Sequence, residues 1–342
     1  MHCTLLIPDL LLPRELGSEP YHELRTTALD TMLARGTSTS RAPVAYEEWL
    51  CNSLGVAKQQ DVPVAAALFS ADGGDAGNHY WLCADPIHVR PDRSRLVFAG
   101  RVDDIEAAEA REMLAALNRH FAGDGLEFIA PSPRRWYVRT GRVPRLSTTP
   151  SAHAVNRSVE PNLPRGDDAM AWHRIMNEAQ MILHAHPANA AREERGAMVV
   201  NSLWLWGGGI MPAPSGPVNT IVWSHDPLAR ALVAATRAIY YDLPPDCAAW
   251  LAAASGEDHL LVCDGPTTAL READIPAWRS EVAALDANWI TPLLTALRAN
   301  KIALLRLVGC NSGNLLETTI TRSNLWRFWR RARPLASYAA DA

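Results

Sequence analysis

The feature that most constrains the fold is the alternation of strand-like and helix-like segments at both ends of the chain. Near the N-terminus, the apolar segment 4–7 precedes helical patterns over 21–34 and 45–54, and residues 64–69 predict a further buried strand. The same alternation returns in the segments 198–206, 220–223, 227–240, 259–263, 278–297 and 302–308. This order is typical of an α/β protein, so we expect one core sheet flanked by helices.

A block of different character interrupts this alternation. The glycine-rich segment 72–77 precedes it, and an amphipathic helix is predicted over 105–121. Strand-like segments of antiparallel character surround that helix at 80–84, 95–99, 126–129 and 136–139. We therefore expect a smaller α+β domain over 77–190, inserted into a core formed by 1–76 and 191–342.

Composition excludes several classes of protein. A net charge of −4 does not provide a general surface for nucleic acid or an anionic membrane. None of the six cysteines forms a CxxC pair, so a cysteine-based zinc site is not expected. No stretch has the 18 or so consecutive apolar residues of a membrane span, and no secretion signal begins the chain. We expect a cytoplasmic protein without a membrane partner.

The segment VNSLWLWGGG, residues 200–209, places three glycines directly after an apolar strand. A dinucleotide fingerprint needs a helix to start at this point, and Pro212 and Pro214 prevent one. The Gly-Lys-Ser/Thr of a phosphate-binding Walker loop is also absent. We therefore expect the glycines to permit a close backbone crossing.

Other candidate groups have ordinary explanations. His184 and His186 lie two residues apart at a helix end, so they face different directions and cannot share one metal within that helix. Ser224, His225 and Asp226 are adjacent in sequence, but adjacency does not produce the geometry of a catalytic triad.

The C-terminal segment is basic and aromatic. Two interpretations stay open: a surface whose arginines grip phosphates while its tryptophans stack on bases, or an amphipathic helix with its aromatic face in the core. The residues concerned are Trp326, Arg327, Trp329, Arg330 and Arg331.

Two motifs suggest a family. HPANAAR at 186–192 and NSLWLWG at 201–207 resemble the motifs His-Pro-x-Asn-x-x-Arg and Asn-x-x-Trp-x-Trp-Gly of the archaeal-type cofactor-independent phosphoglycerate mutases, members of the alkaline phosphatase superfamily. The likeness covers residues 80–300. It implies an alkaline-phosphatase-like core sheet with an inserted α+β domain, and it makes 199–206 a core strand beside the domain junction.

The resemblance also implies a reaction. Enzymes of this family use two divalent ions and a serine nucleophile for phosphoryl transfer. By alignment, Asp9 keeps a ligand position at the end of the first strand, and Asp264 keeps a carboxylate. A ligand aspartate is replaced by Thr267, and a ligand histidine by Arg271.

These replacements predict loss of the metal site. Threonine is a poor ligand for a divalent ion, and arginine brings a positive charge to the position of a cation. Arg271 is then expected to fill the site by pairing with Asp9 or Asp264. Ser38 and Ser40 stand nearest to the expected nucleophile. We expect no cofactor; manganese or zinc would be bound only if the protein is an enzyme.

The segment 85–92 and the ending 326–331 are similar to a smaller group of bacterial regulatory proteins, of the regulation-of-pathogenicity-factors E type (RpfE-like). This likeness implies a regulatory role. The leading hypothesis is therefore a catalytically degenerate, phosphoglycerate-mutase-like pseudoenzyme that binds a protein partner or a phosphorylated small molecule.

The expected binding cleft has a specific lining. It consists of Asp85, His88, Arg90, His186, Asn189 and Arg192. For Asn189 and Arg192, a scaffold role that braces the strand at Asn201 is an open alternative. Two other functions also stay open: a metal-dependent phosphomutase or phosphatase for a small phosphoester, and an interaction module for nucleic acid or a DNA-associated protein.

Overall fold

The computed structural model describes residues 1–341 except 14–15, 41, 94, 217 and 312. The chain divides into two compact units: unit 1 comprises Met1–Gly55 and Gly216–Ala342, and unit 2 comprises Val56–Ser215. Unit 2 is thus inserted into unit 1, and it is larger than the predicted insertion of 77–190. Within the described ranges, no helix combines the length and the apolar character that a bilayer span requires.

Unit 1 is built on a seven-stranded sheet with the order β2-β12-β11-β1-β10-β8-β9. Strands β11, β1, β10, β8 and β9 are parallel, whereas β12 and then β2 add to one edge in antiparallel pairing. The strands are β1 (His2–Pro8), β2 (Thr37–Ser40), β8 (Ile221–Trp223), β9 (Ile239–Tyr241), β10 (Asp258–Val262), β11 (Leu304–Cys310) and β12 (Leu315–Thr321).

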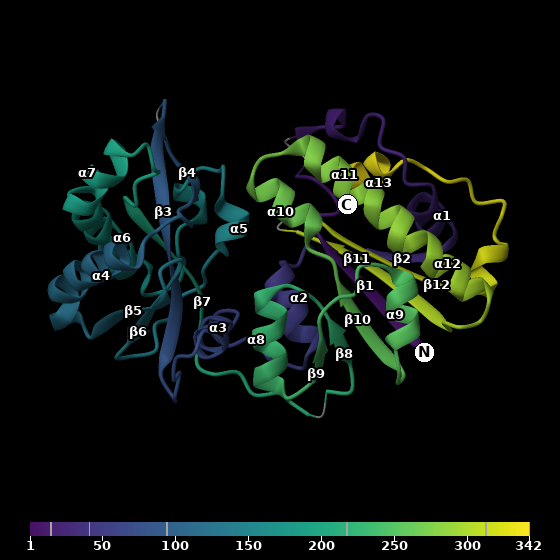
Figure 1. The fold of residues 1–342 in the computed structure, drawn as a ribbon, viewed down its shortest axis with the longest axis horizontal. Coiled ribbons are helices and arrows are strands. Elements are labelled where there is room, and N and C mark those ends of the chain that lie inside the picture. Colours follow the sequence, from purple (N-terminus) through teal and green to yellow (C-terminus); the bar gives the residue numbers. More distant parts are fainter. Residues whose placement is uncertain (14–15, 41, 94, 217, 312, 342) are drawn as a thin grey trace. The chain divides into compact units, whose positions relative to one another are not determined.

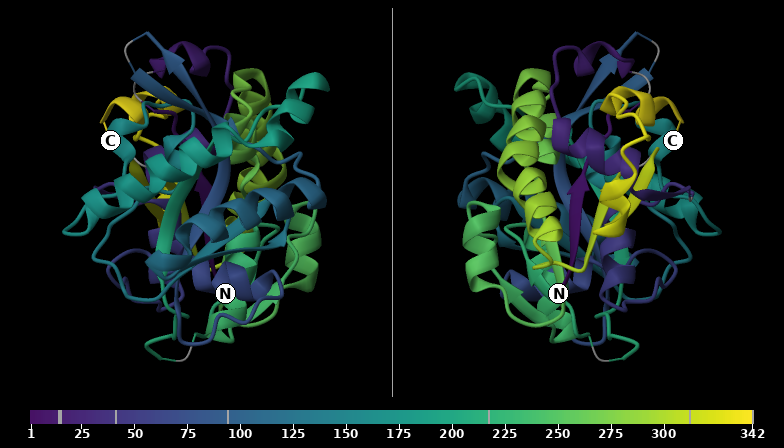
Figure 2. Two further views of the ribbon diagram at one scale, coloured as in Figure 1. Left: turned by 90° about the vertical axis from the view of Figure 1, so that its left-hand side faces the viewer. Right: turned by 90° about the vertical axis from the view of Figure 1, so that its right-hand side faces the viewer.

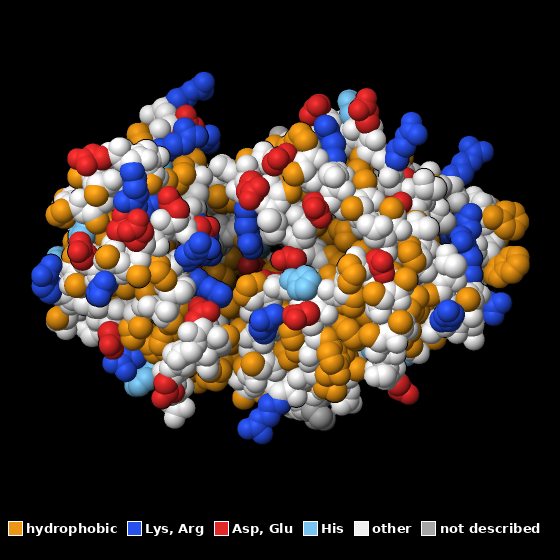
Figure 3. All heavy atoms as spheres, in the orientation of Figure 1, with side chains coloured by type: hydrophobic (Ala, Val, Ile, Leu, Met, Phe, Trp, Pro, Cys, Tyr) orange, Lys and Arg blue, Asp and Glu red, His pale blue; other side chains and the backbone are white. Residues whose placement is uncertain are grey.

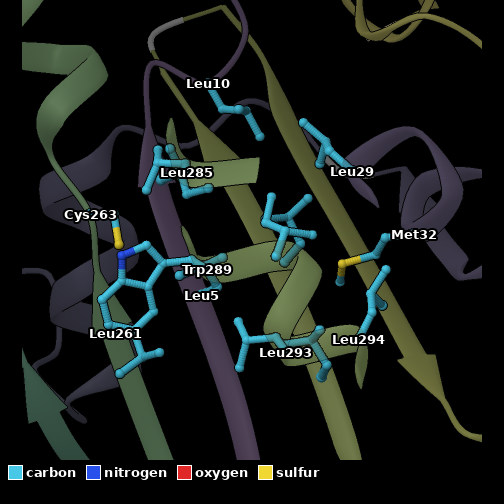
Figure 4. Close-up of a cluster of buried hydrophobic side chains, with 14 of the residues drawn as sticks. Leu5, Leu10, Leu29, Met32, Leu261, Cys263, Leu285, Trp289, Leu293 and Leu294 are labelled. Atoms are coloured by element: carbon cyan, nitrogen blue, oxygen red, sulfur yellow. The ribbon is translucent and has the colours of Figure 1, made fainter. Parts of the chain in front are cut away.

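Helices cover this sheet, and the main apolar core lies between the sheet and one helical layer. In Figure 4 the side chains of Leu5 and Leu261 from the strands meet Trp289 and Leu293 from the helical layer, with Met32 beside them. The helices are α1 (Thr27–Arg35), α2 (Tyr46–Ser53), α8 (Pro227–Thr236), α9 (Cys247–Ala253), α10 (Gly265–Arg271), α11 (Ile275–Leu285), α12 (Thr291–Arg298) and α13 (Leu335–Asp341), with short 3-10 turns at Glu19–Tyr21 and Ser323–Trp326.

A π-helical turn, Asp286–Ile290, joins α11 to α12 in one continuous helical rod, seen in green in Figure 2. Its first residue has a structural use. The Asp286 carboxylate accepts hydrogen bonds from Leu29 N at 2.6 Å and Ala28 N at 3.3 Å, so it satisfies the open amide groups at the start of α1. Burial raises the pKa of Asp286, and these two amides oppose that rise.

Unit 2 is an antiparallel sheet with the order β4-β3-β6-β5, and β7 pairs with β3 along its other side. Helices α4, α6 and α7 lie on one face of this sheet, and α3 and α5 lie on the other (Figure 1). The elements are α3 (Ala65–Ala71), β3 (Tyr80–Asp92), β4 (Arg95–Arg101), α4 (Ala107–Phe121), β5 (Leu126–Ser132), β6 (Arg135–Thr140), α5 (Ser151–Ala154), α6 (Ala169–His184), α7 (Pro187–Glu194) and β7 (Ser202–Gly209), with 3-10 turns at Ala122–Asp124 and Glu160–Asn162.

The expected class, an α/β core with an inserted α+β unit, is confirmed, but four local predictions are wrong. The predicted strand 64–69 is the buried helix α3, since its alanines favour a helix. The predicted core strand 199–206 is β7, which belongs to the sheet of unit 2. The polar composition of Thr37–Ser40 predicts a loop, but this segment forms the edge strand β2. Residues 327–334 form turns and irregular backbone where a C-terminal helix was expected.

Candidate functional site

The candidate site lies in unit 1, at the carboxyl edge of its parallel strands. Strands β8, β10, β1 and β11 are neighbours, so the residues that follow them emerge at one edge of the sheet. Asp9 follows β1, with its amide bonded to Cys310 O at 3.0 Å. It adopts a left-handed conformation (φ 55°), which is uncommon for a residue with a side chain, and Trp278 Nε1 donates to its carbonyl at 2.9 Å.

Asp226 follows β8, and its carboxylate accepts hydrogen bonds from other groups of the protein. It caps α8 by accepting hydrogen bonds from Leu228 N at 3.3 Å and Ala229 N at 3.1 Å, and it also accepts the Tyr46 hydroxyl. The phenol of Tyr46 is buried against this carboxylate. Burial and the charge of Asp226 both raise the pKa of Tyr46 well above its usual value, so the phenol stays protonated as the donor.

Asp264 lies at the start of α10, close enough to Asp226 for their charges to interact. Burial raises the pKa of Asp264, the charge of Asp226 raises it further, and the nearby Arg271 opposes the rise. The expected Arg271–Asp264 salt bridge is not among the ion pairs of the described residues, so Arg271 acts on Asp264 from a longer distance. Thr267, three residues along the helix, buries its hydroxyl, which has no hydrogen-bond partner in the described part of the chain.

These residues do not fit the two-metal centre that the family resemblance implies. Among the described residues, no group of three or more His, Cys, Asp or Glu side chains is arranged to hold a metal ion. The oxygens of Asp226 are used as a helix cap, and Arg271 places a positive charge near Asp264. We derive no reaction step through a metal here.

We predict that Asp264→Asn stabilises the protein by about 1 kcal/mol at neutral pH, because it removes a partly buried charge that Asp226 repels. The pKa of Asp264 is raised in the folded state, so the ionised carboxylate lowers the stability of the fold by its full amount above the raised pKa. This loss of stability disappears as the pH falls below the usual pKa of 3.8. The gain of the variant should therefore shrink on acidification. Thermal unfolding at about pH 7.5 and about pH 4 measures it.

The matched control for that substitution is Asp274→Asn. Asp274 caps α11 by accepting the amide of Ala277 at 2.8 Å, and asparagine caps a helix about as well as aspartate. This control should leave stability unchanged. A variant Asp264→Asn that is less stable than the natural protein at neutral pH would show that the carboxylate is held by attractive partners.

In unit 2, Asp85 forms the centre of a buried polar cluster on β3. Its carboxylate accepts Trp206 Nε1 at 2.8 Å and Arg101 Nη1 at 3.4 Å. Asp85 is 3% exposed, and its charge raises the pKa of Arg101. On the same strand, His88 is half-buried with its Nδ1 3.1 Å from Val199 O, whereas Arg90 is exposed.

Asn189 and Arg192 of α7 are scaffold residues. The amide group of Asn189 bonds to Leu183 O at 2.7 Å, Val200 O at 2.8 Å and Val200 N at 3.0 Å. Arg192 is 0% exposed and donates from Nε to Met198 O at 2.8 Å. This agrees with the scaffold alternative, in which these two residues brace the start of β7.

The remaining contacts extend this bracing role. His186 caps α7 by accepting the amide of Ala188 at its Nδ1, at 3.2 Å. Asn201 bonds to both the amide and the carbonyl of Val89 at 2.8 Å, joining the start of β7 to β3. These hydrogen bonds place Asp85 in one buried cluster and His186, Asn189 and Arg192 in the bracing contacts of α7, and a cleft lined by all six residues stays a prediction.

The glycine run allows a close approach, as predicted. A Cβ at Gly207 would lie 2.5 Å from Val64 Cγ2, and one at Gly208 would lie 2.3 Å from the Tyr80 hydroxyl. The amide of Gly208 points at Asp61 Oδ2 at 3.4 Å, and Asp61 also accepts the amide of Thr148 at 3.1 Å. Burial raises the pKa of this enclosed carboxylate, and the hydrogen bonds from Thr148 oppose the rise.

Sequence reasoning missed the partners of the predicted residues. Glu109 pairs with Arg192 at 2.7 Å and with Arg195 at 2.6 Å. Its pairing with Glu106 as the capping box of α4 is a signal that the sequence carries. Tyr46 and Arg101 carry no such signal, because only the packing of distant segments brings them to Asp226 and Asp85.

The C-terminal aromatic residues point into solvent, which contradicts the interpretation that places them in the core. Trp326, Phe328 and Trp329 are 72%, 74% and 67% exposed. Two arginines anchor the segment to the end of α1: Arg327 Nη1 donates to Arg35 O at 3.3 Å, and Arg330 Nη1 donates to Gly36 O at 3.0 Å. Among the described residues, Arg331 forms no ion pair with a carboxylate.

Unit 2 contains the residues that match a known protein family. A family model of 2,3-bisphosphoglycerate-independent phosphoglycerate mutase matches residues 84–189. The chain is 28% identical over 153 residues to a probable mutase of this kind from Geobacter sulfurreducens, covering 44% of this chain and 38% of that protein. It is 26% identical over 203 residues to the mutase of Methanosarcina mazei, covering 55% and 49%. The chain thus spans half the length or less of these two relatives.

A solved structure from Pyrococcus horikoshii resembles the whole fold, with a TM-score of 0.55 and 13% identity over 94% of this chain and 87% of its own. That likeness concerns the fold alone. The class is an α/β protein whose core sheet carries an inserted α+β unit. The sequence matches support the resemblance to the phosphoglycerate mutases over the part of the chain that they cover: the family model matches residues 84–189, and the two relatives align with 44% and 55% of this chain.

Proposed function

We propose that this protein is a catalytically degenerate member of the phosphoglycerate-mutase-like family. It would be a pseudoenzyme with a binding or regulatory role that does not perform metal-dependent phosphoryl transfer. The observation that carries the proposal is the use of the side chains at the carboxyl edge of unit 1. Asp226 serves as a helix cap for α8, while Thr267 and Arg271 stand at two family ligand positions. Those side chains are unsuited to holding a divalent ion.

The distribution of the family match supports the same proposal. The matched residues 84–189 lie entirely within unit 2, whereas Asp9, Asp264, Thr267 and Arg271 lie in unit 1. A family match in unit 2, together with altered residues at the ligand positions of unit 1, is the pattern that this proposal predicts. The ligand class we propose is a phosphorylated small molecule or a protein partner.

The test combines metal content with activity. The purified chain is incubated with manganese or zinc, its bound metal is measured by elemental mass spectrometry, and turnover of 3-phosphoglycerate is assayed. We expect near-zero metal per chain, no turnover, and no effect of Asp9→Asn on either quantity. One or two tightly held ions per chain, with turnover that Asp9→Asn abolishes, would replace the proposal with a metal-dependent phosphomutase or phosphatase.

A gain-of-ligand variant sharpens this test. Thr267→Asp combined with Arg271→His restores the family residue types at two positions of α10. If the replaced ligand residues are what prevents metal binding, the double variant should bind more manganese or zinc than the natural chain. This binding would be measured as a metal-dependent rise in Tm. The matched control is the pair Thr268→Asp with Glu272→His, in which both substitutions are shifted by one residue, the second to the residue that ends α10.

A further inference from the structure

The segment of residues 322–333, which we call the arginine–aromatic segment, has charge properties unlike the rest of the chain. No Asp or Glu occurs from residue 318 to 340, although the whole chain has a net charge of −4. Its five arginines are Arg322, Arg327, Arg330, Arg331 and Arg333. In the described residues, Arg322, Arg327, Arg330 and Arg331 form no ion pair, whereas Arg192, Arg195 and Arg306 each pair with a carboxylate. An unneutralised group of arginines favours an anionic ligand.

The same segment exposes planar apolar surface. Trp326, Phe328 and Trp329 are each about two-thirds to three-quarters exposed. They are the most exposed of the large aromatic side chains among the described residues. Figure 3 shows hydrophobic side chains standing out where this segment runs, with Lys or Arg side chains next to them. Phe328 and Trp329 pack edge to face, with ring centroids 5.4 Å apart, which leaves ring faces open to solvent.

The segment is anchored at its base. Arg35 Nη1 donates to Leu325 O at 2.8 Å, and Arg327 and Arg330 each use one nitrogen on the carbonyl groups at the end of α1. A guanidinium group has five N–H donors, so these arginines keep donors for phosphate oxygens while the anchors limit their movement.

We propose that the arginine–aromatic segment binds single-stranded nucleic acid, with bases stacked on the exposed rings and phosphates held by the arginines. In the sequence, aromatic and arginine residues are interspersed over 326–331, so groups that stack on bases lie next to groups that bind phosphates. A flexible single strand of nucleic acid can contact this segment alone. A flat anionic membrane would face the acidic remainder of the surface as well, which charge repulsion disfavours. This proposal does not rest on the proposed loss of catalysis.

Fluorescence anisotropy of dye-labelled oligo-dT and oligo-U, titrated with the full chain, tests the proposal. We expect binding that weakens about tenfold between 50 and 200 mM salt, as release of ions from two or three phosphates predicts. Trp326→Ala with Trp329→Ala should weaken binding about tenfold or more at constant salt, through lost stacking. Arg331→Glu should weaken it most at low salt.

The matched control is Arg111→Glu, an equal charge reversal at an exposed position of α4. It should leave the affinity unchanged, and circular dichroism should show that all variants are folded. No binding at low salt would overturn the proposal, as would binding that the tryptophan variant leaves intact. Capture by vesicles of phosphatidylglycerol without oligonucleotide binding would overturn it in favour of a membrane surface. Tryptophan-dependent self-association without oligonucleotide binding would overturn it in favour of a second copy of the chain.

Discussion

Arg192→Ala is expected to destabilise unit 2 by about 3–5 kcal/mol, the scale measured when one member of a buried ion pair is removed. Arg192 is 0% exposed and pairs with Glu109 at 2.7 Å and with Asp104. Its Nε also holds Met198 O at 2.8 Å. The substitution therefore leaves the Met198 carbonyl without this donor, weakens the neutralisation of Glu109, and opens a cavity at the position of the Arg192 side chain.

Urea unfolding followed by circular dichroism measures this loss, and hydrogen exchange locates it around residues 198–201. Arg195→Ala is the matched control, because Arg195 pairs with the same Glu109 at 2.6 Å but is 37% exposed. We expect it to cost less than about 1 kcal/mol, as exposed pairs do. Equal effects of the two substitutions would show that burial does not govern this network.

Gly207→Ala is expected to destabilise unit 2 by about 2–5 kcal/mol, from two separate causes. Gly207 has φ 70°, and an L side chain costs roughly 1–2 kcal/mol in that left-handed conformation. The new Cβ would also lie 2.5 Å from Val64 Cγ2, and crowding of a packed core costs roughly 1–3 kcal/mol. The free energy of unfolding in urea tests this sum.

A second substitution separates the two causes. Val64→Ala removes the clashing Cγ2, so in the double variant the cost of Gly207→Ala should fall to the backbone part alone. Gly123→Ala is the matched control, because Gly123 has no atom within 4 Å of an added Cβ and no positive φ. A change of more than about 0.5 kcal/mol at Gly123 would point to an effect of glycine flexibility in the unfolded chain.

The sequence determined the parts of this protein that depend on local pattern. The apolar segment 4–7, the amphipathic pattern over 105–121 and the alternation near the C-terminus predicted their elements because burial imposes a period on each type of element. The glycine run predicted a close crossing, since only glycine lacks the side chain that would block one. The motifs around His186 and Asn201 predicted the resemblance to the phosphoglycerate mutases, which the family match over 84–189 supports, and residues of these motifs brace β7.

Only the tertiary structure decided the questions that depend on contacts between distant segments. Residues 199–206 are equally apolar in either sheet, and pairing with β3 placed them in unit 2. The pattern of Trp326, Phe328 and Trp329 suits a buried helix face, and the anchors at the end of α1 hold them in solvent. Asp226 became a helix cap that accepts Tyr46 because α2 and α8 meet, although 180 residues separate the two side chains. A sequence fixes which groups are available, but long-range packing decides which of them meet.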